Sequence, residues 1–267
     1  IDILRKTAYT EDTTSQALPG KETCPMRADT LTTAAPVFSA KPRRRAREVR
    51  DPYDGLRPWS AITHGVGAAL GVAGTVLLLL RVWNLGGGWT AGAAFLIYGL
   101  SMIGLYTAST LYHCLNTPVA GRIALRKYDH ISIYFLIAGT YTPICLLTLP
   151  QDGGIPMLIV VWAVALLGTV MALVWIDAPR WVTAGVYLFM GWMSVFMIPA
   201  LLRNLSPLGF FWLALGGVLY TVGGVLYAVK WPGRNNPRFG CHEIFHLFIL
   251  LGSVAHFFLM YQVVALP

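Results

Sequence analysis

Histidine residues in this 267-residue sequence have a spacing that suits metal binding. His242 and His246 are four residues apart, which places both side chains on one face of a helix. Two imidazoles in that arrangement can bind one metal ion, and His113 is the candidate third ligand. Three imidazoles leave one zinc position open for a catalytic water, whose pKa falls to about 7. We expect zinc rather than iron or nickel because the ligands are imidazoles.

Two further polar residues accompany these candidate ligands. Ser109 precedes His113 by four residues, and Asp129 is the carboxylate of the third apolar segment. Asp129 could orient a metal-bound water or act as a base, and Ser109 could donate a hydrogen bond to a developing oxyanion. Simpler alternatives stay open: Asp129 could pair with Arg126 or Lys127, Ser109 could bond the backbone one turn back, and the histidine pair could be hydrogen-bonded within a polar core.

The residues from His242 to His246 also spell the HExxH pattern. In zinc metalloproteases the glutamate of this pattern, here Glu243, is the general base. The pattern is short and recurs by chance, so an intramembrane protease is a minor alternative.

The elements that must position these residues are apolar. Hydrophobic residues make up 56% of the chain and charged residues 12%, with a mean hydropathy of +0.60. This composition excludes a disordered protein and argues against an ordinary soluble enzyme. Each of seven apolar runs has about 20 residues or more, enough to cross a bilayer as a helix. The runs are 61–80, 89–112, 128–149, 155–176, 181–202, 208–229 and 241–266. We therefore predict an all-α polytopic membrane protein, a bundle of seven transmembrane helices, with kinks at Pro143 and Pro199.

Charge predicts the domain organisation and the orientation. Residues 1–57 carry 11 of the 20 basic residues and are interpreted as a flexible cytoplasmic tail, followed by a membrane domain over 58–267. The basic cluster at 41–50 fits contact with anionic lipid, and nucleic-acid binding is not expected because no aromatic residues interleave with it. With the N-terminus in the cytoplasm, 18 of the 20 basic residues fall on the cytoplasmic side. We predict a cytoplasmic N-terminus, an external C-terminus and a multi-pass protein of the bacterial inner membrane.

This topology brings the candidate site together. His113 then lies at the cytoplasmic end of the second helix, Asp129 near that end of the third, and His242 and His246 in the first turns of the seventh. Ionisable side chains at membrane depth are costly and point to function.

The motifs resemble the haemolysin III family, the prokaryotic branch of the progestin and adipoQ receptor superfamily. The resemblance rests on the segments Ala61–Gly65, Ser109–His113, Asp129 with Gly139–Pro143, and His242–His246. These motifs occur in the family's order, and the similarity covers about 54–266.

The resemblance implies a seven-helix bundle with a lipid-accessible cavity. It implies that His113, His242 and His246 hold zinc near the cytoplasmic face, with Asp129 contacting a zinc-bound water and Ser109 beside it. It also implies ceramidase-like hydrolysis of a lipid amide. Glu243 is not a required catalytic group across the superfamily.

Three functions remain open at this point. The first is a zinc-dependent hydrolase of membrane lipid amides or esters. The second is a non-catalytic sensor or homeostasis factor for membrane lipids with a structural zinc. The third is a cytolytic protein, although the sequence offers no charged pore lining. The substrate, the protein partners and the oligomeric state are not predicted.

The remaining histidines are His64, His130 and His256. His64 lies at the right depth to line a cavity, and His256 lies too far along its helix to reach the same ion. We expect all three to be hydrogen-bonded structural residues.

Overall fold

Seven long apolar helices make up the described part of the chain, as the sequence predicts. A computed structural model describes residues 56–233, 236 and 239–263; the predicted tail and its basic cluster lie outside them, except Leu56 and Arg57. The elements are α1 (Pro58–Asn84), α2 (Trp89–Cys114), α3 (Val119–Pro143), the π-helix η1 (Ile144–Thr148), α4 (Gly154–Val174), α5 (Arg180–Trp192), the 3₁₀-helix η2 (Met193–Met197), α6 (Ile198–Asn204), α7 (Pro207–Val229) and α8 (Cys241–Val263). Within these residues, all regular secondary structure is helical, and each of the seven helical spans is long enough to cross a membrane.

Two spans change helix type at the predicted prolines. The third span passes from α3 into the π-helix η1 directly after Pro143, and the fifth passes through the 3₁₀-helix η2 just before Pro199. Proline removes a backbone donor and collides with the preceding turn, which explains why the regular α-helix is interrupted at both places.

The third helix begins before the apolar run from which the sequence predicts it. The run begins at 128, whereas α3 begins at Val119. The added turns carry Arg122, Arg126 and Lys127, so hydropathy alone does not detect them. Their side chains bond to neighbouring segments: Arg126 pairs with Asp177, and Lys127 donates to the carbonyl of Leu173. The charged start of α3 is therefore part of the bundle end.

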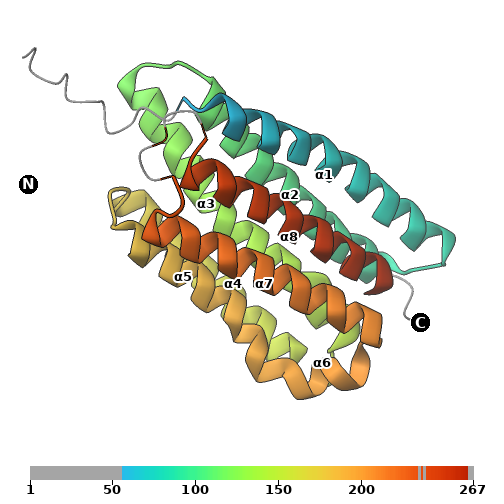
Figure 1. The fold of residues 1–267 in the computed structure, drawn as a ribbon. Coiled ribbons are helices and arrows are strands. Elements are labelled where there is room, and N and C mark those ends of the chain that lie inside the picture. Colours follow the sequence, from blue (N-terminus) through green and yellow to red (C-terminus); the bar gives the residue numbers. More distant parts are fainter. Residues whose placement is uncertain (1–55, 234–235, 237–238, 264–267) are drawn as a thin grey trace, which may run out of the picture. The chain divides into compact units, whose positions relative to one another are not determined.

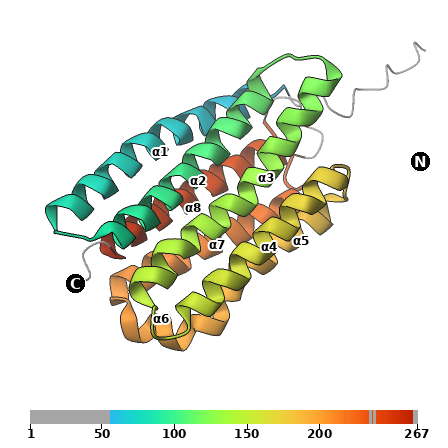
Figure 2. The same cartoon turned by 180° about the vertical axis from the view of Figure 1, so that it is seen from behind.

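The spans pack side by side around a common interior. Helix α1 packs against α2 and α8, α3 packs against α2 and α4, and α7 packs against α5 and α8 (Figures 1 and 2). Gly67 and Gly71 on α1 face Tyr106 and Ile103 on α2, where an added Cβ would crowd these side chains. The small residues thus let α1 and α2 approach closely.

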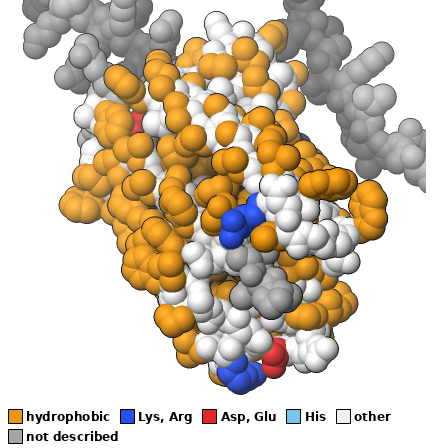
Figure 3. Space-filling model, turned by 90° about the vertical axis from the view of Figure 1, so that its right-hand side faces the viewer, with side chains coloured by type: hydrophobic (Ala, Val, Ile, Leu, Met, Phe, Trp, Pro, Cys, Tyr) orange, Lys and Arg blue, Asp and Glu red, His pale blue; other side chains and the backbone are white. Residues whose placement is uncertain are grey.

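The outer surface suits a lipid environment. Large apolar side chains stand exposed on the helices, and Figure 3 shows them covering much of one face, with few charged side chains between them. Examples are Leu77, Leu100, Leu167, Phe196, Val229 and Leu251. So much exposed apolar surface is expected of a membrane-spanning domain and not of a soluble one. Which end of the bundle faces the cytoplasm stays a prediction from the charge distribution.

Candidate metal centre

Three histidines from two helices converge at one end of the bundle. His113 lies in the last turn of α2, and His242 and His246 lie in the first two turns of α8. The Nε2 atoms of His113 and His242 are 3.1 Å apart, and one ligand nitrogen from each ring lies within 4.8 Å of the other two. His113 and His246 are buried, and His242 is half-buried. The predicted juxtaposition is therefore present.

This donor set fits a divalent metal ion. Zinc–nitrogen bonds of about 2.0–2.1 Å at tetrahedral angles separate two ligand nitrogens by about 3.3 Å. The separation between His113 and His242 is close to this value, and a ligand nitrogen of His246 lies within 4.8 Å of both. Within the described residues, this trio is the only group of three or more metal-ligating side chains so close together. The three histidines can hold a metal ion; the geometry does not choose which metal.

Ser109 and Asp129 lie on the same cavity as the three histidines. Ser109 is buried one turn before His113 on α2, and its side chain is a hydrogen-bond neighbour of the Asp129 carboxylate on α3. Of the expected alternative partners of Asp129, Lys127 bonds a backbone carbonyl, whereas Arg126 pairs with Asp177 at 2.8 Å and its charge also acts on Asp129. The carboxylate is therefore placed beside the candidate metal centre.

The cavity that these residues line is of ligand size. Its volume is about 470 Å³, within the range of small-molecule sites in proteins. One end carries the three histidines with Ser109 and Asp129; the rest is lined mainly by apolar side chains, including Leu136, Ile144, Leu201, Phe210 and Leu213. The arrangement places a polar reaction centre at one end of a long apolar chamber.

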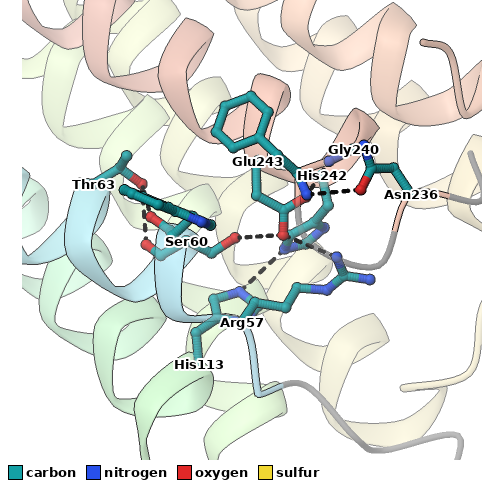
Figure 4. Close-up of polar contacts among 10 residues, drawn as sticks. Arg57, Ser60, Thr63, His113, Asn236, Gly240, His242 and Glu243 are labelled. Atoms are coloured by element: carbon teal, nitrogen blue, oxygen red, sulfur yellow. Dashed lines mark hydrogen bonds and ion pairs between the residues drawn. The ribbon is translucent and has the colours of Figure 1, made fainter. Parts of the chain in front are cut away.

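An ion pair fastens the first and last helices beside the centre. Arg57, just before α1, donates from Nη1 to Oε1 of Glu243 at 2.9 Å, and the Ser60 hydroxyl donates to the same oxygen at 3.4 Å (Figure 4). The other oxygen, Oε2, accepts the backbone N–H of Gly240 at 2.8 Å, which caps the start of α8. The backbone N–H of Arg57 also donates to the carbonyl of His113 at 3.0 Å. Arg57 therefore contacts both helices that carry the candidate ligands.

Glu243 does not occupy the place of a protease base. Its side chain is 2% exposed, both carboxylate oxygens accept hydrogen bonds from the protein, and it is not among the residues that line the cavity. A general base must reach the proton that it removes. The HExxH spelling here combines two candidate metal ligands with a structural carboxylate.

Two of the other histidines differ from expectation. His64 and His256 are buried, yet no ring nitrogen of either has a hydrogen-bond partner among the described residues, and both line the cavity. By strict geometry the expected hydrogen bonds of these two rings are not formed, although the backbone of His246 lies near His64 and that of Leu213 lies near His256. His64 stacks on His246 with ring centroids 3.7 Å apart and so supports a candidate ligand. His130 also lines the cavity, and its backbone carbonyl accepts a hydrogen bond from Tyr187.

Arg57 is the site residue that sequence reasoning missed. The predicted boundary assigns it to the tail, although it lines the cavity and pairs with Glu243. The signal available in the sequence is Glu243 itself, because an acid buried at membrane depth needs a cationic partner, and Arg57 is the basic residue nearest the start of the first span.

Fold and site together define a multi-pass membrane protein with a buried three-histidine centre, and comparison with known proteins supplies the family. The model of the family described as "Haemolysin-III related" matches residues 58–257. The chain belongs to this family, which confirms the resemblance carried by the four motifs.

Curated relatives agree with this assignment. The chain is 39% identical to "Hemolysin-3 homolog" of Bacillus subtilis (strain 168) over 199 residues, which cover 74% of this chain and 90% of the relative. It is 37% identical to "Hemolysin-3" of Bacillus cereus over 203 residues, covering 74% and 87%. The human "Monocyte to macrophage differentiation factor" is more distant, at 26% over 175 residues, covering 62% and 68%.

Proposed function

We propose that this chain is an integral membrane hydrolase of lipid amides or esters that uses zinc held by His113, His242 and His246. The observation that carries the proposal is that the three imidazoles open into the same cavity as Asp129 and Ser109. A zinc ion bound there would polarise a carbonyl oxygen and lower the pKa of a coordinated water towards 7.

The polar residues beside the centre have roles that fit this hydrolysis. Asp129 accepts a proton from the attacking water and returns it to the leaving amine or alcohol, as a general base and then a general acid. Ser109 holds the Asp129 carboxylate in position and can turn its hydroxyl towards the developing oxyanion. His64, stacked on His246, fixes the orientation of that ring.

The cavity favours a lipid as substrate. Its apolar length can accommodate an acyl chain, with the scissile carbonyl at the histidine end. Beside His242 a smaller polar pocket of about 180 Å³ is lined by Arg57, Arg180 and Lys230, which suits a polar or anionic head group. A carbonyl that joins head group and chain would therefore lie at the candidate metal.

We also infer the membrane and the side on which the centre lies. The relatives of higher identity are bacterial, and the positive-inside distribution puts the starts of α1 and α8 on the cytoplasmic side. The centre then faces the inner leaflet of the bacterial inner membrane.

The proposal is tested with purified protein in lipid nanodiscs. We expect one zinc per wild-type chain by elemental analysis, and release of fatty acid from an N-acyl sphingoid amide or an ester lipid. The variant His242→Ala should lose at least tenfold in metal affinity together with the hydrolysis. Fully zinc-loaded wild-type protein that leaves every lipid amide and ester unchanged would overturn the hydrolase.

A non-catalytic lipid sensor is the second candidate, and one observation favours it. The three histidines join α2 to α8, and Arg57 joins the same two helices, so a metal there could act as a staple. A sensor predicts zinc binding without lipid turnover in the same assay. A cytolytic activity, which the names of the relatives suggest for those proteins, predicts leakage of dye-filled liposomes by the purified chain.

A further inference from the structure

His256 is a buried imidazole that faces the cavity far from the metal centre. His256 is 7% exposed, lies ten residues beyond His246 on α8, and lines the same cavity. Neither of its ring nitrogens has a hydrogen-bond partner among the described residues; the Leu213 carbonyl is near the ring but does not meet hydrogen-bond geometry. A buried polar group without a partner is costly, and more so at membrane depth. The imidazole therefore has unused hydrogen-bonding capacity that a ligand can satisfy.

The surroundings make room for this ring. Gly216 on α7 faces His256, and a Cβ at that position would collide with the imidazole. The hydroxyls nearby satisfy one another: Tyr106 donates to Ser253 at 2.7 Å, and Tyr220 and Ser253 share a hydrogen bond of 2.9 Å. The Tyr220 ring packs against the imidazole with centroids 5.1 Å apart. The neighbours thus hold the ring in place without using its nitrogens.

The distance from the metal centre to His256 determines which carbon of a bound acyl chain would lie beside this ring. Ten helical residues between His246 and His256 correspond to about 15 Å along α8. An extended chain advances about 1.2 Å per bond, since the three backbone bonds of a residue span at most about 3.6 Å. An acyl chain whose carbonyl lies at the three histidines would therefore pass His256 at about its twelfth carbon.

We propose that His256 binds a hydroxyl group carried near the middle of a long acyl chain, so that the substrate class is a mid-chain hydroxylated acyl lipid. This inference rests on the proposed function, because it takes the carbonyl to lie at His113, His242 and His246. A neutral imidazole offers one donor and one acceptor, which match the acceptor and donor of a hydroxyl group. A methylene at that position would leave both ring nitrogens unsatisfied.

The test compares two probes of equal length, octadecanoic acid and 12-hydroxyoctadecanoic acid, with 2-hydroxyoctadecanoic acid as the positional control. Their affinities for the zinc-loaded full chain in nanodiscs are measured by competition with radiolabelled octadecanoic acid. The affinity for 12-hydroxyoctadecanoic acid is divided by the affinity for octadecanoic acid, and this ratio is compared between wild type and variants. Partitioning of the two acids into the bilayer is the same for every variant and therefore cancels. We expect His256→Leu to lower this ratio about fivefold to tenfold, and to leave the 2-hydroxy ratio unchanged.

A glycine variant on α7 tests the role of the His256 ring without removing it. Gly216→Ala pushes a methyl group against the imidazole and should also lower the 12-hydroxy ratio, even if His256→Leu does not fold. Gly185→Ala on α5 is the matched control, because a Cβ there would meet nothing within 4 Å and the residue is not among those that line the cavity, so it should keep the wild-type ratio. A ratio unchanged in both His256→Leu and Gly216→Ala would overturn the proposal and leave a bound water as the partner of the ring.

Failure of the proposed function gives a different result. If none of the three acids binds the zinc-loaded protein, the lipid site itself is rejected, and the assignment of His256 falls with it. If the acids bind, and His242→Ala weakens all three equally, the lipid site stands and the His256 variants alone decide the hydroxyl subsite.

Discussion

Two carboxylates lie next to the three histidines, and their surroundings differ completely. Glu243 adjoins His242 in sequence, is 2% exposed and uses both oxygens in bonds to Arg57, Ser60 and the backbone of Gly240. Asp129 comes from another helix, lines the cavity and has the Ser109 hydroxyl as neighbour.

The difference shows that proximity in sequence is a poor guide to the chemical role. A carboxylate with both oxygens engaged by the protein holds structure together, and its loss is felt through folding. A carboxylate that faces a cavity can exchange a proton with a ligand, and its loss is felt through turnover. If the proposed function holds, the helix that carries two candidate ligands does not carry the base.

The largest effect is expected from Asp129→Asn. The amide keeps the shape of the side chain but cannot accept the proton, so we expect hydrolysis to fall about 10²-fold to 10⁴-fold. Metal content and melting temperature should stay at wild-type values, measured by elemental analysis and by thermal unfolding in detergent. Full turnover in this variant would remove Asp129 from the mechanism, whereas loss of metal together with turnover would make it a ligand.

A smaller and different effect is expected from Glu243→Gln. Loss of the charge leaves the partly exposed Arg57 guanidinium without its anionic partner, at a cost of about 1–3 kcal/mol, and lowers the melting temperature by about 5 °C. Because Glu243 caps the helix that carries His242 and His246, metal affinity should fall about tenfold, as measured by zinc competition with a chelating dye.

The control for Glu243→Gln is Asp177→Asn, whose ion pair with Arg126 is largely exposed on the aspartate side. This variant should change neither the melting temperature nor the metal affinity appreciably. The assignment of roles is reversed if Glu243→Gln keeps both stability and metal yet loses all hydrolysis.

Much of this arrangement follows from the sequence, because helix direction alternates from span to span. Seven apolar runs put the end of α2 and the start of α8 at the same end of the bundle, and the four-residue spacing puts His242 and His246 on one face. These two facts are enough to predict that His113 meets the pair. The positions of Pro143 and Pro199 likewise predict where the helices change type.

What the sequence does not reveal depends on packing between distant segments. The unsatisfied ring of His256 exists because Gly216, on another helix, leaves space beside it, and because Ser253 is already engaged by two tyrosines. The first turns of α3 carry charged side chains, so hydropathy does not detect them, and their contacts at the bundle end are seen only in the structure. Neither feature produces a pattern that can be recognised in the sequence around it.

The smallest effect is expected from replacing an exposed carboxylate at the other end of the bundle. Asp152, in the turn between η1 and α4, accepts hydrogen bonds from Asn204 at 2.8 Å and Arg203 at 3.0 Å, and these lower the pKa of its carboxyl below the ordinary 3.8. A carboxyl group whose pKa is lower in the folded than in the unfolded protein stabilises the fold at pH values above its ordinary pKa. This stabilisation is lost as the pH falls through the lowered pKa.

Asp152→Asn should therefore lower the melting temperature slightly at pH 7, and the difference from wild type should shrink as the pH falls below 3.8. Thermal unfolding at a series of pH values measures it, and Arg203→Gln should show the same trend, because it removes one of the two donors to the carboxylate. Lipid hydrolysis at pH 7 should equal that of wild type in both variants. A loss of turnover in Asp152→Asn as large as that in Asp129→Asn would mean that any lost carboxylate impairs the bundle, and the contrast between Asp129 and Glu243 would then carry no information about chemistry.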